Sequence, residues 1–253
     1  MEQITSRTNP LVARFRRLAA ERKARRAEGL MVCEGPKMLA EALAWGFVPE
    51  AALLAPGCDP DLPPETRAVR VPADLLRSVA PTQTPQKLLF LVPMPQAAPP
   101  DPLPGSRYLV LDGLQDPGNL GTLWRTADAF GAHGLLLLPG CADPWSPKTL
   151  RATMGACFRL PVFEADLPRA LSLLDRSGLP LFAAALRADT LDLRDLEGDR
   201  WAVAIGSEGR GVSSDLLAAC AATVKIPMTD RCESLNAAVA GAVVLWELCR
   251  GTL

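Results

Sequence analysis

Three apolar segments of this chain each end in a loop of glycine or small polar residues. WAVAIG (201–206) runs into the loop SEGRG, and TVKIP (223–227) is followed a few residues on by Ser-Leu-Asn. The third segment ends near Leu111 and leads through an Asp-Pro-Gly turn into a helical pattern that carries Asn119 and Arg125. Ligands of open α/β sheets bind where the strands end, so this arrangement predicts that three loops converge on one site.

Apolar runs after residue 104 predict an α/β domain with a mainly parallel sheet and helices on both faces. Its strands are expected at about 107–112, 134–139, 180–185, 201–206 and 223–227, with helical patterns between them. This spacing is typical of parallel strands joined by helical crossovers.

Ahead of that domain, residues 93–104 contain six prolines and are expected to form a stiff linker, because proline fixes φ and lacks the amide donor. Residues 1–92 hold a basic helix, a helix at about 36–45 and short apolar runs, which predict a small α/β module. We therefore predict an N-terminal domain at 1–92 and a C-terminal domain at 105–253.

The formal net charge is only −1, but basic residues are concentrated near the N-terminus. Residues 7–26 contain eight basic side chains and one acidic side chain. Such a stretch supplies the sequence-independent attraction to phosphates that nucleic-acid-binding proteins use. It is equally typical of a solvated amphipathic helix in which Leu11, Phe15 and Leu18 pack inward. Charge alone leaves both interpretations open.

Cysteine and histidine usage argues against several kinds of chemistry. The seven cysteines are scattered, with no Cys-x-x-Cys spacing, so neither a disulfide framework nor a zinc site is predicted. A Ser-His or Cys-His mechanism would depend on the single histidine, His133, which we expect in a surface turn. The N-terminus lacks the apolar core of a secretory signal, and no uncharged stretch approaches the ~20 residues of a membrane span. We therefore expect a cytoplasmic protein without a metal or a membrane partner.

The last helical pattern, from about 234 to 250, is apolar nearly all round. A helix with so little polar surface must be buried. The core of the monomer and a second copy of the chain are both able to cover it, and the sequence leaves these alternatives open.

Three motifs, in this order, resemble those of the SpoU/TrmH branch of the SPOUT RNA methyltransferases. The first is an Asn-x-Gly run that ends in Arg-Thr (119–126), and the second is a Gly-x-Glu-Gly-x-Gly loop (206–211). The third pairs Ile-Pro-Met (226–228) with Ser-Leu-Asn (234–236). The opening ITSRTNPLV and the later CEGPKML are similar to the RNA-substrate domain of many members, so the resemblance covers most of the chain.

The resemblance implies a C-terminal trefoil knot, an exception to the rule that chain connections do not thread loops. It also implies that S-adenosylmethionine binds bent in the knot, through backbone groups and apolar contacts. The residues implied to bind this cofactor are Leu186, Gly206, Ser207, Gly211, Ile226, Met228 and Leu235. A Rossmann site is not indicated, because the glycines are spaced Gly-x-x-Gly-x-Gly and not Gly-x-Gly-x-x-Gly.

The reaction implied by the resemblance is methyl transfer to a ribose 2′-hydroxyl of structured RNA, with ribosomal RNA favoured over transfer RNA. The residues implied to take part are Asn119, Arg125, Glu208, Ser234 and Asn236. A guanidinium is effectively always protonated, so we expect Arg125 to hold a phosphate bidentately while water or a phosphate oxygen takes the proton. We expect Glu208 to organise Asn119 and Asn236. Asn119 and Ser234 are also suited to helix capping, which remains an alternative for each.

In this family the arginine of the first motif is expected to reach the partner's cofactor, which implies a homodimer formed through the C-terminal domain. Asp230 departs from the family pattern, because many members have glycine there. Aspartate tolerates left-handed backbone, so we expect the turn to survive. Asp230 still leaves open a non-catalytic RNA-binding or ribosome-assembly factor with the same fold. A nucleotide-dependent α/β enzyme is disfavoured, because the Walker lysine pattern is missing.

Overall fold

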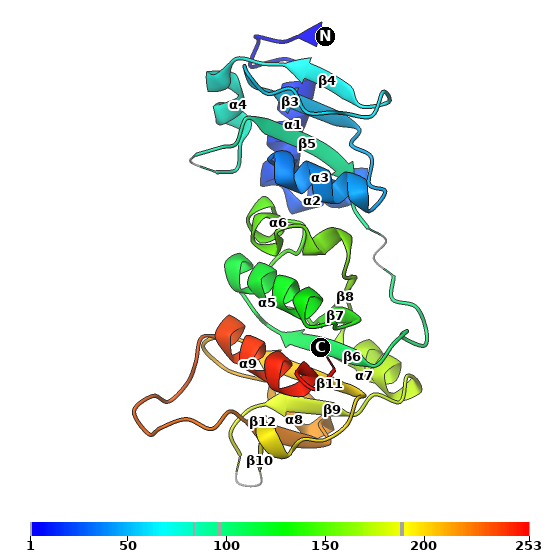
Figure 1. Cartoon of the computed structure of the whole chain (residues 1–253), viewed down its shortest axis with the longest axis vertical. Coiled ribbons are helices and arrows are strands. Elements are labelled where there is room, and N and C mark those ends of the chain that lie inside the picture. The colour runs from blue at the N-terminus through cyan, green and yellow to red at the C-terminus, as the bar shows by residue number, and fades with distance from the viewer. Residues whose placement is uncertain (1, 83, 96–97, 188–189, 253) are drawn as a thin grey trace. The chain divides into compact units, whose positions relative to one another are not determined.

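The computed structural model describes residues 2–82, 84–95, 98–187 and 190–252. The chain forms two compact units, each built on its own sheet (Figure 1). Unit 1 consists of Met1–Pro95 and Asp143–Phe158, and unit 2 of Gln96–Ala142 and Arg159–Leu253. This grouping differs from the predicted domain division in two respects. Asp143–Phe158 packs with the N-terminal residues, and the predicted linker is divided between the two units. No helix in the described ranges is both long and apolar enough to span a membrane.

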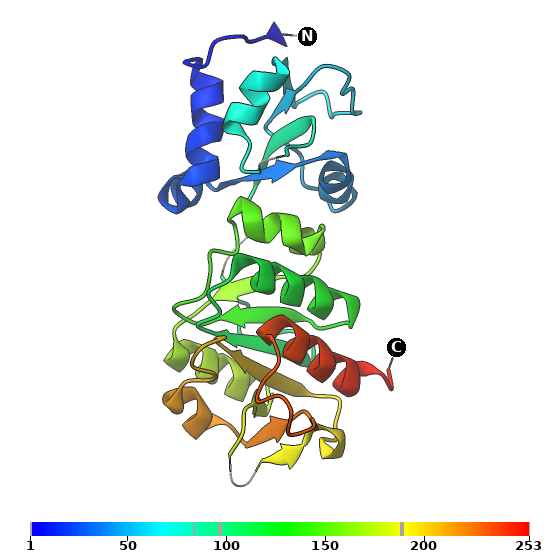
Figure 2. The same cartoon turned by 90° about the vertical axis from the view of Figure 1, so that its left-hand side faces the viewer.

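Unit 1 is a mixed five-stranded sheet with helices on both faces. Its strand order is β1-β4-β3-β5-β2, in which β5 runs antiparallel to both neighbours. Alternate strand residues, such as Leu30, Leu53 and Leu89, are buried in one cluster with α1 and α4, and α3 lies on the other side of the sheet (Figure 2). The elements are β1 (Glu2–Gln3), α1 (Pro10–Ala20), α2 (Arg22–Glu28), β2 (Leu30–Glu34), α3 (Pro36–Ala44), β3 (Ala51–Leu54), β4 (Arg67–Arg70), α4 (Ala73–Val79), β5 (Leu88–Pro93), α6 (Pro147–Thr153) and the 3-10 turn η1 (Ala156–Phe158).

The basic N-terminal stretch forms α1 and α2. Leu11, Phe15 and Leu18 are buried, as the amphipathic pattern predicted. Part of the positive charge is neutralised within unit 1, because Glu28 accepts hydrogen bonds from Arg14 (2.6 Å) and from Arg17. The number of basic residues therefore overstates the charge that these helices present to solvent.

A nearly buried ion pair holds Asp143–Phe158 in unit 1. Arg25 Nη2 donates to Asp143 Oδ2 (2.6 Å), and Arg25 Nη1 donates to the carbonyls of Leu18 (2.6 Å) and Ala19 (3.2 Å). These carbonyls lie in the last turn of α1, where helix carbonyls lack an intrahelical partner. The side chains of Arg25 and Asp143 are 4% and 12% exposed. The guanidinium thus links the end of α1 to the start of the later segment.

Unit 2 is a seven-stranded sheet in which every neighbouring pair of named strands is parallel, as predicted for the C-terminal domain. Its order is β10-β12-β9-β11-β6-β7-β8, so the chain builds outward from β6 and then crosses to the far side of β11. Helices α5 and α9 cover one face, and α7 and α8 cover the other (Figure 2). The elements are β6 (Arg107–Asp112), α5 (Pro117–Ala129), β7 (Gly134–Leu137), β8 (Val162–Glu164), α7 (Leu167–Arg176), β9 (Leu181–Ala184), β10 (Leu191–Asp192), the 3-10 turn η2 (Leu193–Asp195), β11 (Trp201–Gly206), α8 (Ser214–Ala219), β12 (Ala222–Lys225) and α9 (Ala237–Cys249).

The proline-rich segment packs against the protein at both ends. Pro93 is the last residue of β5, and Met94 N donates to the Gly29 carbonyl (2.8 Å). Leu103 is buried, and its amide donates to Ser177 Oγ (2.9 Å). Residues 96–97 of the predicted linker lie outside the described residues.

Helix α9 is buried on one face only. Gly241, Val244 and Leu245 pack inward, whereas Val239 and Trp246 are 50% and 52% exposed. Of the two alternatives that the sequence left open, the core of the single chain therefore covers only one face of α9.

Replacing Asp143 with alanine should lower the free energy of unfolding by about 3 kcal/mol, because the Arg25 guanidinium would stay buried without its carboxylate. Urea unfolding followed by circular dichroism measures this change. Glu2→Ala is the matched control in the same unit, because the Glu2–Arg67 pair is exposed and should matter little. Equal stability of the two variants would contradict a structural role for the Arg25–Asp143 pair.

Candidate active site

A cavity of about 480 Å³ opens at the carboxyl ends of β9, β11 and β12. The strand ends provide an apolar wall that includes Ala184, Ile205 and Val224. The loops after β11 and β12 and the segment before α9 complete the lining. All seven residues predicted to bind the cofactor line this cavity, namely Leu186, Gly206, Ser207, Gly211, Ile226, Met228 and Leu235.

The loop after β11 is closed tightly by backbone hydrogen bonds. Ser207 N donates to the Gly211 carbonyl (3.1 Å), and Gly211 N donates back to the Ser207 carbonyl (2.9 Å). Glycine is required at 206, because a Cβ there would lie 2.0 Å from the carbonyl carbon of Gly211 and 2.2 Å from Val212 N. Gly211 has a φ of 68°, which also favours glycine. The sequence of this loop therefore sets the shape of one cavity wall.

Three polar side chains from distant segments form a hydrogen-bonded chain. Asn119 Nδ2 donates to Glu208 Oε1 (2.7 Å), and Asn236 Nδ2 donates to Asn119 Oδ1 (3.3 Å). Asn236 Oδ1 also accepts from the amides of Ala238 and Val239, so it caps α9. Glu208 therefore bonds Asn119 directly and is connected to Asn236 only through Asn119. Glu208 lines the cavity, so the chain of hydrogen bonds reaches its edge.

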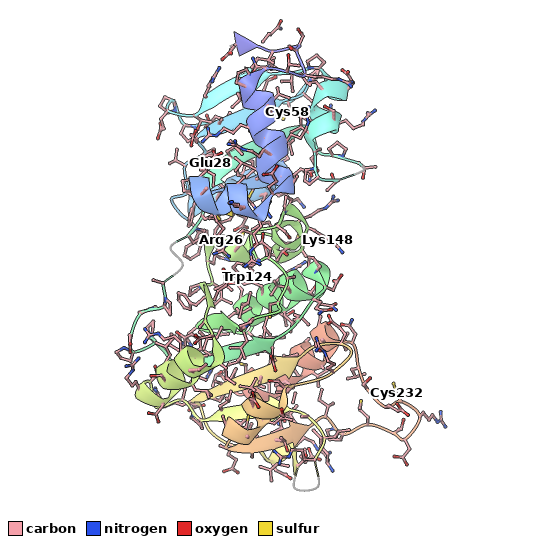
Figure 3. The ribbon with its side chains drawn as sticks, turned by 180° about the vertical axis from the view of Figure 1, so that it is seen from behind. Arg26, Glu28, Cys58, Trp124, Lys148 and Cys232 are labelled. Atoms are coloured by element: carbon pink, nitrogen blue, oxygen red, sulfur yellow. The ribbon has the colours of Figure 1, made fainter. Side chains whose placement is uncertain are left out.

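The sequence left open that Asn119 and Ser234 cap helices, and in the structure other residues provide both caps. Asp116 caps α5, because its Oδ1 accepts from Asn119 N (2.8 Å). Asn119 is therefore not the cap, and its side chain is left to bond Glu208. Asn236, not Ser234, caps α9. Ser234 is an exposed residue of the cavity lining, in the segment that also carries Cys232 (Figure 3).

Arg125 is exposed on α5 and does not line the cavity. Within the described residues its side chain has no hydrogen bond or ion pair. The structure of one chain therefore brings together Asn119, Glu208 and Asn236, and leaves Arg125 outside this group.

Sequence reasoning missed three charged residues of the cavity lining: Arg210, Lys225 and Glu233. Each lies within or directly beside a recognised motif, so the motif neighbours were the signal that could have identified them. Asp230 is exposed, and its backbone is not left-handed, since Met154 is the one non-glycine residue with positive φ in the described ranges.

No cysteine or histidine of the described residues lines this cavity, although the exposed Cys232 directly precedes the lining residues Glu233 and Ser234. Burial raises the pKa of Cys141 and of Cys220 to about 11, so these thiols stay protonated at neutral pH. His133 is exposed and directly precedes β7, at the amino edge of the sheet and away from the carboxyl ends that form the cavity. Partial burial lowers the pKa of His133, with Arg107 adding to the effect. The described residues also contain no group of three or more side chains suited to hold a metal ion.

The parallel sheet, the cavity at its strand ends and the polar chain beside it define a two-unit α/β protein with a preformed small-molecule site. The SpoU rRNA Methylase family model matches residues 106–246, and the model of the MRM3-like substrate binding domain matches residues 9–89. This chain therefore belongs to the SpoU rRNA methylase family.

Individual relatives resemble the chain over nearly its whole length. It is 32% identical to the 23S rRNA (guanosine(2553)-2'-O)-methyltransferase RlmP of Bacillus subtilis, over 98% of this chain and 99% of that protein. The crystal structure of an AdoMet-bound rRNA methyltransferase from Sinorhizobium meliloti superposes with a TM-score of 0.88 at 29% identity, covering 100% of this chain and 98% of that one. The SpoU methyltransferase AviRb from Streptomyces viridochromogenes in complex with AdoMet has a TM-score of 0.84 at 26% identity, covering 96% and 98%.

Gly206→Ala should lower the free energy of unfolding by about 3 kcal/mol, because the new methyl group would overlap backbone atoms that cannot move without opening the loop. Gly209→Ala is the matched control in the same loop, since a Cβ at 209 meets nothing within 4 Å. Thermal unfolding of both variants measures the difference. A Gly206→Ala protein as stable as the control would show that the loop is not closed as described.

Proposed function

We propose that this chain transfers a methyl group from S-adenosylmethionine to a ribose 2′-hydroxyl of structured RNA, and that its substrate is ribosomal RNA. The observation that carries the proposal is the cavity at three strand ends, whose lining includes every predicted cofactor residue. The action of the Bacillus subtilis relative on a 23S rRNA guanosine supports the substrate class.

The residues present fit S-adenosylmethionine. A volume of about 480 Å³ lies in the range of small-molecule cavities. The apolar strand ends suit an adenine ring, and the backbone of the tight loop after β11 suits its polar edge. Carboxylates and cations both line the cavity, at Glu208, Glu233, Arg210 and Lys225, which suits the oppositely charged groups of an amino-acid moiety. When bound, the cofactor supplies an activated methyl group, so the protein has to align the reactants and manage one proton.

The polar chain is proposed to position the RNA ribose. Glu208 holds the amide of Asn119 in a fixed orientation, and Asn236 holds its carbonyl oxygen. Ser234, at the same cavity, is proposed to contact the substrate or cofactor. Arg125 is proposed to hold an RNA phosphate through its planar fork, and the proton passes to water or to a phosphate oxygen.

We also propose that the active form is a homodimer through α9. Exposed Val239 and Trp246 support this proposal, and the contact of Trp246 with Phe130 of the same chain, whose ring centroids are 5.8 Å apart, extends the apolar surface to the end of α5. An exposed apolar helix face of this kind is typical of an interaction surface. Since Arg125 shares α5 with the residues beside this face, a partner's α5 would be able to deliver it to the cavity.

Two finer expectations complete the proposal. We infer that the C-terminal chain threads the trefoil knot that the resemblance implied, because the chain belongs to the SpoU rRNA methylase family. A cytoplasmic location follows from the proposed RNA substrate.

The function is tested by mass-spectrometric mapping of 2′-O-methyl groups in ribosomal and transfer RNA from cells that lack the chain. One ribosomal site should lose its methyl group and regain it when purified protein and S-adenosylmethionine are added. The rival function, a ribosome-assembly factor without turnover, predicts unchanged methylation. Calorimetry separates the two further, since absence of S-adenosylmethionine binding at millimolar cofactor would favour the rival.

Arg125→Lys should lower kcat/KM for RNA about 100-fold while leaving cofactor affinity unchanged, because lysine keeps the charge but loses the bidentate fork. Methyl-transfer kinetics and calorimetry measure the two quantities. Arg194→Lys, an exposed arginine paired with Asp192, is the matched control. Undiminished activity of Arg125→Lys would exclude the phosphate clamp.

Trp246→Glu should raise the dimer dissociation constant at least 30-fold, because a charge would replace a large apolar anchor of the interface. Analytical ultracentrifugation measures the change, and activity should fall with the dimer fraction. Leu191→Glu on β10 is the control, because Leu191 is similarly exposed and lies on another element. A fully active monomer would contradict the role of the dimer.

A further inference from the structure

Exposed large apolar side chains in the described part of unit 1 come from only two segments. Trp45 and Val48 follow α3 and are 53% and 38% exposed, and Met154 ends α6 and is 48% exposed. Single exposed apolar residues are ordinary on protein surfaces, but a group of them calls for an explanation.

The ends of α3 and α6 pack against each other. A Cβ at Gly155 would lie 2.6 Å from Glu41 Cγ, and Trp45 follows Glu41 by one turn, with its amide donating to the Glu41 carbonyl (3.2 Å). The rings of Phe47 and Phe158 are 5.1 Å apart, which joins the same two segments a second time. The two segments that carry the exposed apolar side chains are therefore adjacent in unit 1.

Met154 occupies a backbone conformation that rarely suits methionine. Its φ and ψ are 50° and 36°, the left-handed region in which helices usually end with glycine or asparagine. Met154 is about half exposed, so packing inside the unit does not explain why methionine occupies this position. Strained residues of this kind gather at sites that bind ligands.

Positive charge lies beside the apolar group. Lys148, Arg151 and Met154 follow one another at three-residue intervals along α6, and Lys148 lies on its surface (Figure 3). Arg151 is exposed, and its guanidinium has neither a hydrogen bond nor an ion pair with any residue that the structure describes. We call Trp45, Val48, Met154, Lys148 and Arg151 the aromatic-basic patch.

We propose that the aromatic-basic patch binds an unpaired nucleotide of the RNA substrate, with the base stacked on Trp45 beside Met154 and the phosphate held by Arg151. Unstacked bases are recognised by aromatic side chains and by neighbouring cations, and both are present here. A second copy of the chain is a poorer occupant, because two patches of the same charge would repel each other. The inference rests on the proposed function, since it assumes an RNA substrate.

The test uses unmodified 23S ribosomal RNA transcribed in vitro, with filter binding at ~100 mM salt and steady-state methyl-transfer kinetics. Trp45→Ala should weaken RNA binding about 10-fold and raise KM by a similar factor, with kcat within about twofold, because base stacking is lost while the cavity is unchanged. Trp45→Phe should retain most of the affinity, since the ring remains. Leu191→Ala, which removes an exposed apolar side chain from unit 2, should bind as the wild type does.

Two further variants keep the proposal testable if Trp45→Ala fails to fold by circular dichroism. Arg151→Ala should reduce the slope of log affinity against log salt concentration by about 0.7 to 0.9, the value of one phosphate contact. Met154→Gly removes the side chain proposed to lie beside the base, so it should weaken RNA binding. It also relieves the left-handed strain, so it should not lower the unfolding midpoint.

The outcomes separate the patch from the proposed function. A wild-type protein that methylates no RNA overturns the function itself. A wild-type protein that is active, with Trp45→Ala and Arg151→Ala variants that bind RNA as well as it does, overturns the patch alone. Loss of the dimer in Trp45→Ala, with unchanged RNA affinity, would identify the patch as a self-association surface and would also overturn the inference.

Discussion

The close approach of α9 to α5 is the constraint on which the candidate active site depends. Gly241 lies at this contact, and a Cβ there would be 2.2 Å from Leu123 Cδ2. Because the helices touch, Asn119 and Asn236, 117 positions apart in the chain, come within hydrogen-bonding distance. Glu208 then reaches Asn119 from the loop after β11. Backbone packing therefore fixes the geometry of the polar chain, and short side chains are sufficient to complete it.

The sequence predicted the parts of the fold that depend on local pattern. Strands buried on both faces appear as continuous apolar runs, so the five predicted strands of unit 2 match β6, β7, β9, β11 and β12 within two residues at each end. Strands β8 and β10 are too short to leave such a run. The residues that the resemblance implied for the cofactor line one cavity because the motif loops lie at strand ends, where parallel sheets form their cavities.

Other features depend on contacts that no local pattern encodes. Asp116 and Asn119 are both good caps by residue type, and only the position of the helix boundary decides between them. The ion pair between Arg25 and Asp143 joins residues 118 positions apart, so nothing near either one predicts it. The density of basic residues indicated that the N-terminal helices attract phosphates, but Arg14, Arg17 and Arg25 bond within unit 1. Arg151, whose guanidinium has no partner among the described residues, lies on α6.

Unit 1 is assembled from two stretches of chain that unit 2 separates. The later stretch lies inside the region matched by the methylase family model, yet its partners, among them Arg25 and Phe47, lie in the region matched by the substrate-domain model. Exchange of the N-terminal residues between two relatives would separate these partners unless 143–158 were exchanged as well. An exchange that preserves the contacts of unit 1 therefore has to carry both stretches, and a single crossover between them would leave each with partners from the other relative.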